Sequence, residues 1–266
     1  MNEPTPKGNV FGRVAAIAAN TFREAIRDRI LYNLVLFVLL ITACAVLLGD
    51  LTDGQEARTI VNIGLGAMLL FGVFISIFVG VGLVSKEIEK RTVYAIFSKP
   101  VRRAEFVVGK YLGLCLTLLV NTFVMGVGVS AALLYAGDAT LSFSIWGAIF
   151  LIFLELAIVT AVAVMFSTFS STSLSALFTF LVFVIGNLSS SLRDLGATLG
   201  SAATKLLLDA IYYLLPNFSL FTFRTEAANG LVPNAPMLAG GFGYAAAYIV
   251  VVITIAVAIF SRRNFK

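Results

Sequence analysis

The sequence contains no histidine and very few charged residues. Charged residues make up 12% of the 266 residues, hydrophobic residues make up 59%, and the mean hydropathy is +0.99. A soluble domain of this size carries about 25% charged residues. Histidine is the commonest general base and a common metal ligand, so its absence argues against both kinds of site. The core of a soluble domain could not absorb this much apolar sequence, and we expect the bilayer to be the solvent of the chain.

The motifs of nucleotide binding and hydrolysis are absent as well. The fragment nearest to a Walker A motif, Gly109-Lys110-Tyr111, lacks the first glycine and the hydroxyl residue. There is no GxSxG elbow, and HExxH cannot occur without histidine. Cys44 and Cys115 lie in apolar runs without zinc-type spacing or a disulfide framework, as expected of small packing residues. We predict that the chain is not an enzyme and holds no cofactor or metal itself.

Long apolar runs predict an all-α polytopic membrane protein with six transmembrane helices. Residues 1–30 form a cytoplasmic N-terminus, and residues 31–266 form a single six-span transmembrane domain. Backbone polar groups in lipid must be satisfied within each segment, so the spans are helical. The third run is longer than a bilayer needs and either tilts or continues beyond the membrane. The predicted spans are 31–49, 60–84, 107–136, 144–166, 173–192 and 238–261.

Residues 10–29 predict an amphipathic helix before the first span. Apolar residues from Val10 to Ala25 recur at helical spacing, and Arg13, Arg23 and Arg27 lie mostly on the other side. Such a helix can lie in the membrane interface.

Basic residues predict the orientation. With both termini inside, all of the 19 Lys and Arg residues except Arg58, Arg193, Lys205 and Arg224 lie on the cytoplasmic side. The net charge of +5 then reflects topology and attraction to membrane lipids, and nucleic acid binding need not be invoked. We predict a multi-pass protein of the plasma membrane with both termini in the cytoplasm.

Two connections are longer than turns. Residues 85–106 form a charged cytoplasmic loop. Residues 193–237 form an external segment, in which an apolar helical face reaches Leu215 and Pro216 ends the helix. A second short helix near 218–229 follows. These two helices predict a re-entrant segment that dips into the outer leaflet before the last span.

Within the cytoplasmic loop, residues 86–99 predict a helix that ends before Pro100, because the residue before proline avoids the helical region. On residue chemistry alone two interpretations stay open. The segment is either a basic interfacial loop attracted to anionic headgroups or a docking helix that inserts into a groove on a cytoplasmic partner.

Several short segments resemble the loop between spans two and three of ABC-2 type transporter permeases. They are Glu89-Lys90-Arg91-Thr92, Ser98-Lys99-Pro100-Val101-Arg102-Arg103, Glu105-Phe106 and Gly109-Lys110-Tyr111-Leu112-Gly113. Leu215-Pro216-Asn217-Phe218 and the ending Phe260-Ser261-Arg262-Arg263-Asn264-Phe265 are similar to one branch of this family. That branch contains the permeases grouped with copper-enzyme maturation transporters such as the nitrous oxide reductase accessory system.

The resemblance implies the membrane subunit of an ATP-driven exporter in the bacterial inner membrane. Two permease chains, either a homodimer or a pair with a similar subunit, would work with two copies of a cytoplasmic ABC ATPase that binds ATP and Mg. An extracytoplasmic accessory protein stays open as a further partner. The resemblance makes 86–99 the coupling helix to the ATPase. Its candidate contacts are Glu87, Glu89, Arg91, Thr92, Tyr94, Phe97, Lys99 and Pro100.

Glu155 is the only acidic residue well inside an apolar run. Carboxylates inside a membrane are expensive and by default suggest function. Glu155 is either a substrate contact or proton site, or a hydrogen-bonded carboxyl that links helices through Asn121 or Thr122. Asn187, near the outer end of the fifth span, could line a pathway.

Two alternatives to an ABC permease stay open. One is a proton-coupled secondary transporter centred on Glu155. A single buried acid and the lack of a discontinuous Gly/Pro pair argue against it. The other is a membrane anchor that recruits a cytoplasmic protein through residues 86–103. The substrate cannot be read from the sequence.

Two rows of small residues recur at four-residue spacing, and such rows let helices approach closely. They serve either packing within the chain or a dimer seam. The rows are Gly72, Ser76 and Gly80, and Gly109 and Gly113.

Overall fold

The computed structural model describes residues 10–27, 31–49, 55–89, 102–189, 191, 193 and 202–262. The described part of the chain is helical and contains no strand, which confirms the all-α prediction. The elements are α1 (Val10–Ala25), α2 (Leu31–Gly49), α3 (Glu56–Glu89), α5 (Arg103–Tyr135), α6 (Ala139–Ser144), α7 (Trp146–Ser167), α8 (Thr172–Asn187), α10 (Ala202–Leu214), the 3-10 helix η2 (Phe218–Phe221), α11 (Arg224–Ala228) and α12 (Ala235–Arg262).

Four described helical segments are long and apolar enough to cross a membrane, as judged by length and composition. They are Glu56–Gly82, Arg103–Tyr135, Ala139–Ser167 and Ala235–Arg262, and the third joins α6 to α7. Helix α2 covers the range predicted for the first span, and α8 covers residues 173–187 of the predicted fifth span. However, α8 has only 16 residues, or about 24 Å, against about 30 Å of hydrocarbon. Six crossings therefore stay a prediction.

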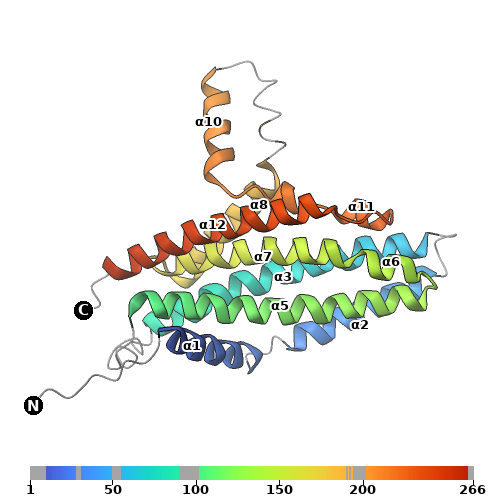
Figure 1. The fold of residues 1–266 in the computed structure, drawn as a ribbon, viewed down its shortest axis with the longest axis horizontal. Coiled ribbons are helices and arrows are strands. Elements are labelled where there is room, and N and C mark those ends of the chain that lie inside the picture. Colours follow the sequence, from blue (N-terminus) through green and yellow to red (C-terminus); the bar gives the residue numbers. More distant parts are fainter. Residues whose placement is uncertain are drawn as a thin grey trace, which may run out of the picture.

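Helix α7 lies at the centre of the bundle. Its sequence is apolar on every side, and nearly every side chain from Ala148 to Val164 is buried. A helix without a polar face is stable only where other helices surround it. Helices α3, α5, α8 and α12 all contact α7, and Figure 1 shows α3, α5, α7 and α12 running side by side along the long axis.

The two rows of small residues pack within the chain. A Cβ atom at Gly109 would lie 2.8 Å from the Ile17 Cβ on α1, and one at Gly80 would lie 3.0 Å from the Ala163 Cβ on α7. The Gly72 position likewise abuts Leu156 of α7. Contacts this close to α1 and α7 leave neither row available as a dimer seam.

The stretch 218–229, where one short helix was predicted, contains two short helical pieces, η2 and α11. Helix α10 projects away from the bundle in Figure 1, and the chain returns through Pro216 to η2 and α11. Proline ends the first helix as expected. Insertion of this segment into a leaflet stays a prediction.

Candidate functional site

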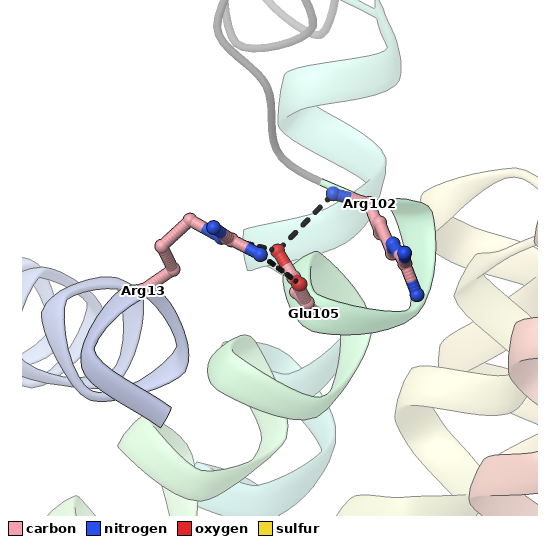
Figure 2. A network of polar contacts seen from close by, with 3 residues as sticks. All are labelled: Arg13, Arg102 and Glu105. Carbon is pink, nitrogen blue, oxygen red and sulfur yellow. Dashed lines mark hydrogen bonds and ion pairs between the residues drawn. The ribbon is translucent and has the colours of Figure 1, made fainter. Parts of the chain in front are cut away.

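The start of α5 is joined to α1 by a two-pronged ion pair. Arg13 donates from Nε to Glu105 Oε2 (2.9 Å) and from Nη2 to Glu105 Oε1 (2.7 Å). Glu105 also accepts from the backbone N–H of Arg102 (3.2 Å), so it satisfies an orphan donor at the helix N-terminus. Figure 2 shows the guanidinium of Arg13 and the Arg102 amide converging on this carboxylate. The Glu105 side chain is only 5% exposed, which makes the pair a fixed link between the two helices.

The same contact raises the pKa of Arg13, chiefly through its hydrogen bond to Glu105. The guanidinium is therefore charged at any physiological pH.

A second ion pair joins the same two helices one turn further along α5. Lys110 Nζ lies 3.5 Å from Glu24 Oε2, and Lys110 is buried while Glu24 is partly exposed. The Lys110 ammonium also lies 5.8 Å from the centre of the Phe106 ring. Buried Lys side chains are paired as a rule, and this one helps to hold α1 against α5.

The first turn of α5 also contacts the end of α12. Arg103 Nη1 donates to the carbonyl oxygens of Ser261 (2.7 Å) and Phe260 (3.3 Å). The rings of Phe106 and Phe260 stack at 5.8 Å. The last carbonyls of a helix have no partner within the helix, so an arginine here satisfies them. One turn of α5 thus binds α1 on one side and α12 on the other.

The predicted coupling residues precede the start of α5 in the sequence. Glu87 and Glu89 belong to the last turn of α3, and their side chains lie outside the described part. Arg91, Thr92, Tyr94, Phe97, Lys99 and Pro100 lie outside the described residues. The description resumes at Arg102, one residue before α5.

The sequence did not predict the three polar contacts at the start of α5. They are the pair of Arg13 with Glu105, the pair of Lys110 with Glu24, and the bonds from Arg103 to the end of α12. The amphipathic pattern puts Arg13 on the polar face of the first predicted helix, and Glu105 belongs to a segment that resembles the family. Their separation of 92 residues leaves no local pattern to pair them. The one available signal was opposite charge on two segments that are both predicted to lie on the cytoplasmic side.

A buried carboxyl joins α7 to α8 deeper in the bundle. Glu155 is 2% exposed, and its Oε1 accepts a hydrogen bond from Asn187 Nδ2 (3.3 Å). The same Asn187 nitrogen donates to the carbonyl of Phe183 (3.2 Å). The pairing brings two predicted site residues together across two helices. A carboxyl that accepts such a bond is easier to bury than an unpaired one.

The expected partners of Glu155 have other environments. The hydroxyl of Thr122 donates to the carbonyl of Leu118 (2.9 Å) within its own helix. The buried Asn121 amide nitrogen has no hydrogen-bond partner among the described residues. The bond to Asn187 therefore replaces the predicted link through Asn121 or Thr122.

A polar turn lies beyond the end of α8. The backbone N–H of Asn217 donates to the Tyr244 hydroxyl (2.9 Å), and its side-chain amide donates to the Tyr212 hydroxyl (3.1 Å). The Ser189 hydroxyl donates to Asn217 Oδ1 (2.9 Å). One buried asparagine thus ties together the end of α8, α10 and α12. The sequence predicted that a helix ends at Pro216 but did not predict this cluster of hydrogen bonds at Asn217.

The sequence model of a family described as ABC-2 family transporter protein matches residues 15–265. No curated protein matches the chain. The match runs from the middle of α1 past the end of α12 and confirms the resemblance at the level of the family. The branch grouped with copper-enzyme maturation stays a prediction.

Proposed function

The chain belongs to the ABC-2 family of transporter proteins, and from this premise we propose that it couples ATP hydrolysis on a separate ATPase to substrate export. The match over residues 15–265 carries the proposal. As a permease, the chain is an integral membrane protein. ATP and Mg would be bound by the ATPase, two copies of which would serve two permease chains. Those chains would form either a homodimer or a pair with a similar subunit.

The proposed coupling helix is residues 86–99, with both chain termini on the same, cytoplasmic side of a bacterial inner membrane. The contacts at the start of α5 support this assignment. A displacement of the segment before Arg102 would reach α1 through Glu105 and Arg13, and α12 through Arg103. A differential contact energy of about 5 kcal/mol is enough to move a two-state equilibrium from one side to the other.

Glu155 and Asn187 support a second candidate function, an ion-coupled step. Their hydrogen bond places the only acidic residue well inside an apolar run at a helix–helix contact, where protonation would change the contact between α7 and α8. In an ABC exporter the same pair would instead line or brace the substrate pathway. An export assay of Glu155→Gln separates the two. A folded variant that keeps its ATPase and its ATP-driven transport would exclude ion coupling.

The proposal is tested by purifying the tagged protein from its native membrane in mild detergent and identifying co-purifying chains. We expect an ATPase with a Walker A motif. The double variant Glu89→Ala/Arg91→Ala should lose it. Glu56→Ala/Arg58→Ala is the matched control, because it removes the same two charges at the opposite end of α3. This control should retain the ATPase.

Two results would contradict the proposal. Absence of an ATPase from the wild-type sample would leave the permease role without its energy source. Retention of the ATPase by Glu89→Ala/Arg91→Ala would place the docking surface elsewhere on the chain.

A further inference from the structure

Helices α7, α8 and α12 and the end of α10 surround a cavity of about 570 Å³. It lies where α10 leaves the bundle beside α8 and α12 (Figure 1). Pockets for small molecules measure about 300–1,000 Å³ and are lined mainly by apolar and aromatic side chains. This cavity is therefore of a size that holds a ligand.

The walls of the cavity are apolar over most of their length. Val162, Phe166, Val182 and Val252 are among the lining residues, and none of the described residues that line the cavity is charged. A charged or strongly polar ligand would lose its hydration here without compensating bonds, at a cost of several kcal/mol. The chemistry of the walls favours a hydrocarbon.

Tyrosines supply the polar atoms at one end. Tyr213, Tyr244 and Tyr248 all line the cavity. The Tyr244 hydroxyl accepts a hydrogen bond from the Asn217 backbone N–H (2.9 Å). The Tyr248 hydroxyl donates a hydrogen bond to the Leu214 carbonyl oxygen (3.4 Å). Tyrosines with an apolar ring and a bonded hydroxyl are typical of the boundary between hydrocarbon and headgroups.

The length of the cavity matches one leaflet of a bilayer. On α12 the lining residues run from Tyr244 to Ile255, a distance of about 16 Å at 1.5 Å per residue. The hydrocarbon core of a bilayer is about 30 Å thick, so one leaflet accounts for about 15 Å. An acyl chain that starts at the tyrosines would reach the far end of the cavity.

A basic residue stands near the tyrosine end. The Arg193 guanidinium lies 4.8 Å from the centre of the Tyr212 ring, and Tyr212 packs edge-to-face on Tyr213 at 5.3 Å. Arg193 is half exposed, and its ion pair with Asp209 is long (3.9 Å), so Asp209 offsets only part of its charge. Positive charge at one end and none along the walls complement a phosphate attached to a hydrocarbon chain.

We propose that this cavity binds one acyl chain of a membrane phospholipid, with the phosphate facing Arg193. The proposal names a ligand and does not rest on coupling to an ATPase. If no ATPase co-purifies, the proposal of a lipid site is not contradicted. If the lipid test fails, the proposed permease function is not contradicted.

The test uses the full chain in nanodiscs that contain a phospholipid with a photoreactive diazirine on one acyl chain. Val251→Trp fills the cavity, because Val251 lines it. Val250→Trp is the matched control, since Val250 is adjacent and similarly exposed (64% against 57% for Val251) but does not line the cavity. We expect labelled peptides around Met165 and Tyr248 in the wild type and in Val250→Trp. Their label should be lost in Val251→Trp.

A second labelling experiment tests recognition of the headgroup. Arg193→Ala should weaken labelling by the phospholipid probe but not by a diacylglycerol probe with the same diazirine chain, because only the phospholipid carries a phosphate. Equal loss with both probes would overturn the placement of the phosphate.

Thermal unfolding establishes that each variant is folded, and Ala247→Trp on the same wall replaces Val251→Trp if that variant unfolds. Equal labelling in wild type, filled variant and control would show ordinary contact with surrounding lipid and overturn the proposal.

Discussion

The packing of α1 on α5 depends on the absence of a side chain at Gly113. A Cβ atom there would lie 2.6 Å from the carbonyl oxygen of Ala18 and 2.6 Å from the Cβ of Thr21. One of these atoms belongs to the backbone and the other is fixed to it. No change of rotamer can relieve the clash, and α1 must move away from α5 in the variant Gly113→Ala.

Two opposing effects set the change in the free energy of unfolding that Gly113→Ala causes. Replacing glycine by alanine inside a helix favours the helix by about 1 kcal/mol. Overpacking of a close contact costs about 1–3 kcal/mol. Because the obstructing atoms are rigid, the clash dominates, and we expect the free energy of unfolding to fall by about 1–2 kcal/mol. The same movement should loosen the pair between Arg13 and Glu105, which lies about two turns away along α5.

The assay combines thermal unfolding in detergent with limited trypsin digestion. Arg23 is already exposed in the docked helix, but proteolysis follows local opening of the backbone. Undocking of α1 should favour such opening, so Gly113→Ala should be cut faster after Arg23 than the wild type. Gly12→Ala is the matched control, because a Cβ at Gly12 would meet no atom within 4 Å. It should unfold at the same temperature as the wild type or slightly above it. If Gly113→Ala were as stable as Gly12→Ala and no more sensitive to trypsin, the close approach of the two helices would be wrong.

Three further predictions address other contacts. Arg103→Ala removes the donor to the last carbonyls of α12 and should lower the free energy of unfolding by about 1–3 kcal/mol, with faster hydrogen exchange at the end of α12; unchanged exchange would contradict the contact. Glu155→Ala removes one of the two acceptors of the Asn187 amide and should cost about 1–3 kcal/mol, whereas Glu155→Gln keeps an acceptor and should cost less in thermal unfolding; equal losses would argue against this hydrogen bond. Asp138 accepts from the N–H of Leu141, and this bond lowers the pKa of Asp138, so its contribution should be present above about pH 4 and lost as the carboxyl is protonated below it. Asp138→Ala should cost about 0.5–2 kcal/mol at pH 7 and show a smaller loss between pH 7 and pH 3 than the wild type, and parallel pH profiles would refute this.

Much of the helical structure follows from the sequence because its causes are local. Apolar runs identify α2, α5, α7 and α12 to within a few residues, since each run satisfies its own backbone hydrogen bonds. Pro216 ends a helix wherever it stands, because it lacks an N–H and clashes with the preceding turn. Helix α3 shows the limit of such reasoning. The predicted span was 60–84, but the helix runs from Glu56 to Glu89, because hydropathy marks the apolar part of a helix and not its polar ends.

The sequence by itself also determined the family, because the segments that resemble it are contiguous. The tertiary structure alone decided which side chains meet. Helical periodicity says which residues share a face but not which helix packs on that face. The sequence could not choose Asn187 over Asn121 as the partner of Glu155, nor pair Arg13 with Glu105. Those choices depend on how whole helices cross, and rigid contacts such as Ala18 on Gly113 decide that only when the bundle is assembled.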